Sequence, residues 1–280
     1  MSSDDRLFSS AAVATEELVV SSSAEAEALR TLLECLARED CVHSWRNFDR
    51  DGTCEDLLRW ENARRPTELF FYHLKFGDRT QLVGAGAVAD RLTRDFPNPG
   101  FCVLGRCCIL PEFRGRGFYR HFLHHRLNHC QARFGGALKA VHIGAVDERV
   151  SRVITNHRLP GWPEFVHLGE EALHVAGQIR PVGAYLLLMP DYVRSLVTLL
   201  AGEPAPPSVA ALRRELLRIG SSGVRNLGVL VKDCVDEATT SGWFDGRDRG
   251  DIEELLLFCR SIPLVGLGAA APPIVPGAPS

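Results

Sequence analysis

The stretch CCILPEFRGRGFYRHFL at residues 107–123 is the feature that most constrains this chain. An apolar run that predicts a buried strand meets Arg-Gly-Arg-Gly, and a segment with helical spacing follows at once. A strand that turns through two glycines into a helix directs several backbone N–H groups and the positive end of the helix dipole toward one place. With Arg114, Arg116 and Arg120 beside it, this corner predicts an anion site.

The glycine spacing at the corner excludes two common phosphate-binding loops. A mononucleotide P-loop needs Gly-x-x-x-x-Gly-Lys-Ser/Thr, and the chain has no such run at this place. A dinucleotide fingerprint needs Gly-x-Gly-x-x-Gly, but Gly115 and Gly117 are followed by Phe118, Tyr119 and Arg120. The anion is therefore not predicted to be a nucleotide held in either of these ways.

The periodicity of the chain predicts an α/β fold with a helical extension. Over residues 16–190 the predicted order is β-α-α-β-β-β-α-β-α-β-β, in which 67–75 and 80–90 form a hairpin. Hairpins combined with one strand-helix-strand crossover predict a mixed β-sheet flanked by helices. The predicted division is a disordered tail at 1–15, the α/β domain at 16–190, a helical extension at 191–262, and a disordered Pro/Gly/Ala tail at 263–280.

Composition limits the function classes. The 280 residues carry a formal net charge of -3, which argues against a protein that coats nucleic acid, because phosphate neutralisation needs a basic face. No run reaches the roughly 18 apolar residues of a membrane span, and the acidic start MSSDDRLF has no signal-peptide core. Nine cysteines without a Cys-x-x-Cys pair predict free thiols in a reducing compartment, so we expect a cytoplasmic protein.

The corner resembles the pyrophosphate-binding motif of the GNAT acyltransferase superfamily. That motif has the form Gln/Arg-x-x-Gly-x-Gly/Ala between the fourth strand and the third helix, and it stands here as RGRGFY at residues 114–119. The preceding ILPEF run is the usual approach to it, and the element order predicted over about residues 16–190 is the one that the family uses. The resemblance implies a GNAT-like mixed β-sheet.

The resemblance also implies a ligand, acetyl-CoA or another acyl-CoA, and no metal. Its pyrophosphate would bind the backbone amides of residues 114–119, and its pantetheine arm would lie between the strands near 107–110 and 142–145. The implied cofactor-binding residues are Ile109, Arg114, Gly115, Arg116, Gly117, Phe118 and Tyr119. Tyr119 departs from the family, which has a small residue there, and its side chain could crowd the phosphate.

The implied reaction is direct attack of an amine on the thioester, which needs a base, oxyanion donors and an acid for the leaving thiolate. The family often places a tyrosine acid late in its fourth helix, and His157 stands at the matching position. An imidazolium could protonate the thiolate, although a histidine at a helix end can also simply complement the dipole. Asp147 and Glu148 are the candidate bases, or else they cap the helix that they open.

Three histidines on the predicted helix have a spacing that could hold a metal ion. His121, His125 and His129 are spaced at i, i+4 and i+8, but the Glu of His-Glu-x-x-His is missing. We therefore expect them to form the polar face of the helix. Cys107 and Cys108 lie in an apolar run, which favours core thiols over a nucleophile.

These observations predict an acyl-CoA-dependent N-acyltransferase, most simply an N-acetyltransferase, whose acceptor is a small-molecule or peptide amine. A non-catalytic acyl-CoA-binding or partner-binding protein with the same fold is the alternative, because of Tyr119 and the missing tyrosine. A synthase of long-chain N-acyl amino acids or acyl-homoserine lactones is a lesser one. We expect neither nucleic acid nor a membrane as partner, and self-association could use the C-terminal helices.

Overall fold

The structure is a computed structural model of the chain. It describes residues 17–22, 67–76, 79–90, 99–145, 148–156, 159–175, 178–219 and 226–262. The helices predicted between residues 22 and 66, and both predicted tails, lie outside the described residues.

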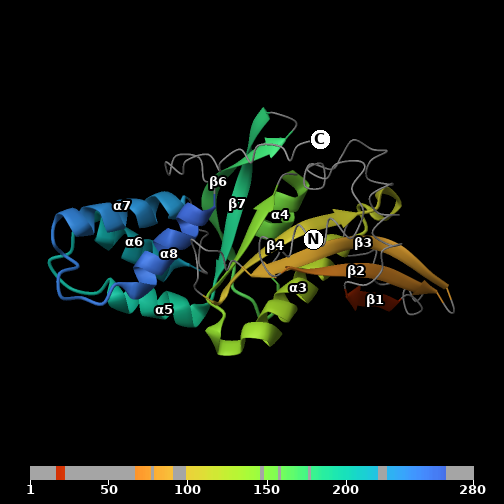
Figure 1. The fold of residues 1–280 in the computed structure, drawn as a ribbon, viewed down its shortest axis with the longest axis horizontal. Helices are drawn as coiled ribbons and strands as arrows, with labels where there is room; N and C mark the ends of the chain where they lie inside the picture. Colours follow the sequence, from red (N-terminus) through yellow and green to blue (C-terminus); the bar gives the residue numbers. More distant parts are fainter. Residues whose placement is uncertain are drawn as a thin grey trace, which may run out of the picture.

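The described strands form one mixed β-sheet, with the order β1-β2-β3-β4-β5-β7-β6 (Figure 1). Neighbours are antiparallel except β4 and β5, which run parallel. The strands are β1 Glu17–Ser22, β2 Thr67–Phe76, β3 Arg79–Asp90, β4 Phe101–Ile109, β5 Ala140–Ala145, β6 Phe165–Val175 and β7 Gln178–Leu188. The predicted hairpin is β2 with β3, and the predicted mixed β-sheet with flanking helices is confirmed.

Helices follow the strands in the predicted order. They are α3 Phe118–Phe134, α4 Glu148–Asn156, α5 Pro190–Leu199, α6 Pro207–Arg218, α7 Leu227–Thr240 and α8 Gly250–Ser261, with short 3-10 turns at Pro111–Phe113 and Gly135–Ala137. The last four gather at one end of the sheet, beside β6 and β7, and β1–β3 form the opposite end (Figure 1). None of the helices in the described part of the chain is long and apolar enough to span a bilayer.

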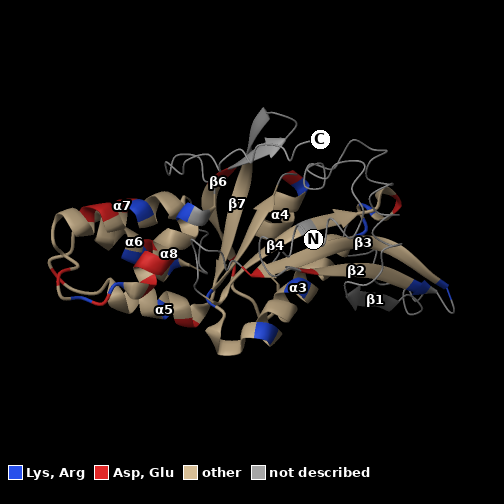
Figure 2. Ribbon diagram, in the orientation of Figure 1, with Lys and Arg blue, Asp and Glu red and all other residues tan. Residues whose placement is uncertain are grey.

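The core has two apolar clusters, one for each helical group. The first joins α3 and α4 to β2–β5, and it includes Phe71, Tyr72, Phe122 and Leu127. The second joins α5–α8 to β5, β6 and β7 through side chains such as Leu186. The described strands carry few charged side chains, whereas the helices and loops carry many (Figure 2). The helices after residue 190 therefore cover sheet surface, as an integral layer of the fold.

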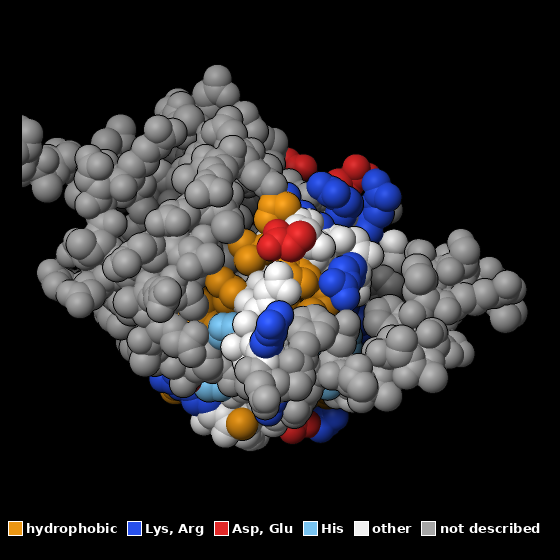
Figure 3. Space-filling view, turned by 90° about the vertical axis from the view of Figure 1, so that its right-hand side faces the viewer, with side chains coloured by type: hydrophobic (Ala, Val, Ile, Leu, Met, Phe, Trp, Pro, Cys, Tyr) orange, Lys and Arg blue, Asp and Glu red, His pale blue; other side chains and the backbone are white. Residues whose placement is uncertain are grey.

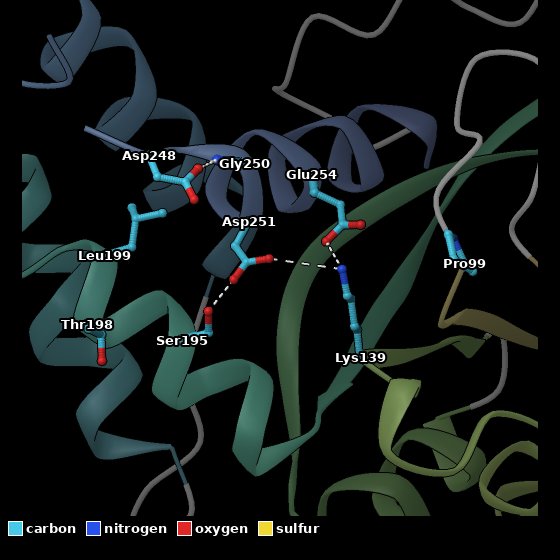
Figure 4. Close-up of a pocket in the computed structure, with 9 residues that line it drawn as sticks. All are labelled: Pro99, Lys139, Ser195, Thr198, Leu199, Asp248, Gly250, Asp251 and Glu254. Carbon is cyan, nitrogen blue, oxygen red and sulfur yellow. Dashed lines mark hydrogen bonds and ion pairs between the residues drawn. The ribbon is translucent and has the colours of Figure 1, made fainter. Parts of the chain in front are cut away.

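Lys139, just before β5, links the start of this strand to the C-terminal helices. Its backbone N–H donates to Gly100, and its carbonyl accepts from Met189. Its ammonium group lies 2.6 Å from the carboxylate of Glu254 in α8, which is only 8% exposed (Figure 4). The same group lies 5.6 Å from the ring centroid of Tyr192 in α5. The carboxylate of Glu254 is largely buried, and Lys139 is the close cation that the structure places beside it. The packing of α8 against the sheet therefore depends on this ion pair.

Replacing Lys139 by Met should lower the free energy of unfolding by about 1–3 kcal/mol, because Glu254 keeps a charge without its cation. The value is below that of a fully buried pair because Lys139 is about a third exposed. Urea unfolding measures the change, with Lys232→Met as the matched control, since Lys232 pairs with Asp236 on the helix surface. We expect the control to cost less than about 0.5 kcal/mol. Equal losses in both variants would contradict this role of Lys139.

Candidate functional site

The parallel strands β4 and β5 part at the centre of the sheet. They pair from Phe101 with Ala140 to Leu104 with Ile143, and no further. Yet β4 continues to Ile109, held on its other edge by β3, and β5 continues to Ala145, held by β7. We call this opening the fork. Backbone groups that face each other across it are available to an extended ligand, because buried N–H and C=O groups need partners.

The corner follows directly where β4 ends. Leu110 donates from its backbone to Val83, and the 3-10 turn Pro111–Phe113 leads into the glycines. Gly115 has φ 76° and Gly117 has φ 81°, a left-handed conformation that other residues adopt at a cost. Gly117 is the N-cap of α3, without a side-chain cap and without an acidic residue in the first turn. The first N–H groups of α3 therefore offer their hydrogen bonds to an external acceptor.

Arginines surround these backbone groups. Arg114 donates from Nε to the carbonyl of Ile109 at 3.0 Å, so it joins the corner to the last residue of β4. The guanidinium of Arg116 lies 5.6 Å from the ring centroid of Phe113 and 5.3 Å from that of Phe118, which fixes its position by cation–π contact. Figure 3 faces the end of the molecule opposite α5–α8, where several Lys and Arg side chains surround an apolar centre on the described surface. The corner thus combines backbone donors with positively charged side chains.

Tyr119 points inward. Its ring is partly buried and packs against the first core cluster, and burial raises its pKa. The nearby Arg126 is 1% exposed and donates to the carbonyls of Gly105 and Phe122 at 3.2 Å. The tyrosine that the sequence suggested could crowd a phosphate therefore turns toward the core.

The predicted catalytic residues fall in different places. His157 and Asp147 lie outside the described residues. Glu148 opens α4 with its side chain 80% exposed, and its carboxylate pairs with Arg152 one turn along the helix at 2.9 Å. The geometry of Glu148 is that of a solvated helix pair.

The three histidines of α3 do not converge on one point. His125 Nδ1 lies 3.2 Å from the hydroxyl of Tyr72, and His129 Nε2 lies 2.8 Å from the carboxylate of Glu68. His121 is exposed. Across the parts of the chain that the structure describes, no cluster of three His, Cys, Asp or Glu side chains could hold a metal ion. Burial raises the pKa of Cys107, and Arg126 opposes this shift, so the thiol is no activated nucleophile.

A carboxylate-imidazole pair lies on β5 and β6, and sequence reasoning missed it. His142 Nε2 is 3.6 Å from Glu171 Oε2, and the two side chains are 5% and 15% exposed. The one local signal was a histidine inside the apolar run AVHIGA. The pairing itself depends on β7 lying between β5 and β6, which the order of residues does not reveal.

A pocket of about 670 Å³ lies away from the fork (Figure 4). Pro99 and Lys139, which precede β4 and β5, form one wall, and residues of α5 and α8 form the other. Asp251 pairs there with Ser195 and lies 4.0 Å from Lys139. The corner is at the other end of β4, so this pocket is separate from the fork.

A search with the sequence finds no matching protein-family model and no matching curated protein. Solved structures do match. A spermidine N-acetyltransferase from Vibrio cholerae, in complex with CoA and spermine, is 14% identical at a TM-score of 0.44, over 61% of this chain and 95% of that one. RimL, a ribosomal L7/L12 α-N-protein acetyltransferase in complex with coenzyme A, is 16% identical at a TM-score of 0.42, over 61% of this chain and 94% of that one. The function of this chain is therefore inferred from its own residues.

Replacing Gly115 by Ala should destabilise the fold by about 1 kcal/mol, because an L-residue is strained at φ 76°. The space around it is open, so the cost is that of backbone strain alone. Gly136→Ala is the matched control, since that glycine also has open space and no positive φ. We expect the control to change the free energy of unfolding by less than about 0.5 kcal/mol. If urea unfolding gives the same change for both, the left-handed turn at Gly115 is not required.

Proposed function

We propose that the protein is an acyl-CoA-dependent N-acyltransferase and that acetyl-CoA is its usual donor. One observation carries the proposal: the glycine corner with its uncapped helix opens directly at the mouth of the fork. An anion site and an extended slot at one place suit a ligand that has a pyrophosphate joined to a long amide-bearing arm. CoA has these two parts in this order.

The corner supplies the pyrophosphate site. Backbone N–H groups of residues 115–119 and the positive end of α3 would bind its oxygens, and the side chains of Arg114 and Arg116 would add charge-assisted hydrogen bonds. The backbone N–H of Arg114 itself donates to the carbonyl of Pro111. The space beside Gly115 is open, since a Cβ there would meet nothing within 4 Å. Because glycine has no Cβ, a phosphate can approach the backbone closely at this position. Arg114 also bonds the carbonyl of Ile109, so the anion site and the slot are joined by one side chain.

The fork supplies the slot. The pantetheine amides would pair with backbone groups of β4 between Gly105 and Ile109, as a further strand pairs with a sheet edge. The thioester would then lie near the base of the fork, beside Leu104 and Ile143, where the strands close again. Main-chain recognition explains why the side chains of CCIL can be ordinary core residues.

The reaction is a direct transfer between the acceptor amine and the CoA thioester. The nitrogen of the acceptor attacks the thioester carbonyl, the C–N bond forms, and the C–S bond breaks. The nitrogen loses one proton and the CoA thiolate gains one, so amine and thioester give amide and thiol without a net proton change. A backbone N–H of the fork could stabilise the oxyanion, and His157 is proposed as the acid for the thiolate. The acceptor is proposed to be a small-molecule or peptide amine.

Acetyl-CoA should raise the melting temperature of the protein by several degrees, since a ligand at a hundred times its Kd adds about 2.7 kcal/mol. Pantetheine, which lacks the pyrophosphate, should give no shift at the same concentration. The double variant Arg114→Ala with Arg116→Ala should weaken acetyl-CoA binding at least about tenfold, because two charge-assisted contacts are lost. Calorimetric titration measures this loss.

A charge-matched control separates the corner from general electrostatics. Arg214→Ala with Arg260→Ala removes the same charge from exposed positions on α6 and α8 and should leave the Kd within about twofold. If no CoA species shifts the melting temperature, the proposal is wrong. Acyl-CoA binding without thiol release across amines would favour the non-catalytic alternative, and a shift with long-chain acyl-CoA alone would favour the long-chain synthase.

A further inference from the structure

We propose that Glu171 is the base that accepts the proton of the attacking amine and that His142 is its positioning residue. This inference rests on the proposed acyl transfer and names the proton acceptor in the same site. Neither residue belongs to the corner or to the helix segment that the sequence singled out.

The pair spans three adjacent strands. His142 is in β5 opposite Val103, and Glu171 is in β6 opposite Val182 of β7. The small side chain of Ala184 lies between them on β7, paired with Gly144 on β5. Glu171 can therefore reach across β7, and its carboxylate lies 3.6 Å from the imidazole of His142.

Two glycines clear the space around this carboxylate. The last residue pair between β4 and β5 is Leu104 with Ile143. The next residue on each strand is a glycine, Gly105 on β4 and Gly144 on β5. A Cβ on Gly144 would collide with the Glu171 carboxylate, whereas a Cβ on Gly105 would meet nothing within 4 Å. The carboxylate thus lies against Gly144, the first residue of β5 that no longer pairs with β4. The space over Gly105, the first residue of β4 that no longer pairs with β5, is open. That position is the base of the fork.

The pair and the glycines lie on the sheet face opposite α3. Arg126 of α3 contacts Gly86, which shares its face with Val88 and with Leu104. Since side chains alternate along a strand, Gly105 points to the other face, and so do His142 and Gly144. α3 and the corner would hold CoA from one side, so the acceptor amine would approach Glu171 from the other.

Burial suits the two roles. The side chain of His142 is almost fully buried, and its ring centroid lies 6.4 Å from that of Phe258 in α8. His142 is therefore shielded from a substrate. Glu171 is partly exposed, so a substrate can meet its carboxylate. A carboxylate that lies beside a buried imidazole and against Gly144 has little room to change its conformation, which suits a positioned base. Among the described residues, His142 is a titratable group that lies within ion-pair distance of Glu171.

The proton transfer balances with the acyl transfer. As the lone pair of the nitrogen forms the C–N bond, the N–H bond breaks. Its electrons stay on the nitrogen, and the proton passes to Glu171 Oε1 or Oε2. The C–S electron pair leaves with CoA, and the thiolate takes a proton from the acid. Glu171 then returns its proton to solvent, and the pair is restored.

The test compares thiol release by Glu171→Gln, Glu171→Asp, His142→Gln and the control Glu170→Gln. Glu170 is the exposed neighbour of Glu171, and it points to the other face. The acceptor probes are spermine, L-lysine and an alanine tripeptide, and calorimetry measures acetyl-CoA binding by each variant. Glu171→Gln should lower kcat/KM at least about 100-fold with an unchanged acetyl-CoA Kd. Glu171→Asp should restore part of the rate.

The pH profile separates catalysis from packing. Wild-type kcat/KM should rise with pH as Glu171 loses its proton and then level, whereas Glu171→Gln should lack this step. His142→Gln should move the midpoint of the step, and Glu170→Gln should leave it unchanged. An unchanged rate and profile in Glu171→Gln overturns the inference and leaves the proposed function standing. Wild-type protein that binds acetyl-CoA without thiol release also overturns the inference, whereas failure to bind any acyl-CoA overturns the proposed function itself.

Discussion

The parting of β4 and β5 is the constraint on which the site depends. Each strand keeps its outer neighbour, because β3 pairs with β4 as far as Ile109 and β7 pairs with β5 as far as Ala145. The fork is therefore rigid before any ligand arrives, and its backbone groups are oriented in advance. A preorganised slot reduces the ordering cost of binding, so main-chain contacts alone can hold a flexible arm. The corner, the arginines and the buried Arg126 all lie along the β4 side of this opening.

Features coded by local patterns could be predicted from the sequence. The hairpin β2–β3, the glycine corner and the helices after residue 190 follow from periodicity and from glycine chemistry within one short segment. Features that depend on strand order could not. β7 is inserted between β5 and β6, and this crossing brings Glu171 to His142 from 29 positions away in the chain. The burial of Arg126 could not be predicted for a related reason, since helical spacing alone cannot show that a guanidinium packs against the sheet.

The two helical groups divide the work of the sheet. α3 presents the corner and closes one face, with Arg126 holding the carbonyl of Gly105 beside the fork. α5–α8 cover the other face over β5, β6 and β7, and Phe258 backs His142 there. Lys139 links the start of β5 to α8 through Glu254. The C-terminal helices thus support the strands that carry the proposed base.

Amide hydrogen exchange with and without acetyl-CoA tests the central claim most directly. If the corner and the fork hold the ligand, saturating acetyl-CoA should slow exchange of the amides at residues 114–119 and of those between Gly105 and Ile109 that face β5. The amides of α7, on the far side of the second core cluster, should exchange at the same rate in both states. Unchanged exchange at the corner and the fork under saturating ligand would contradict the claim.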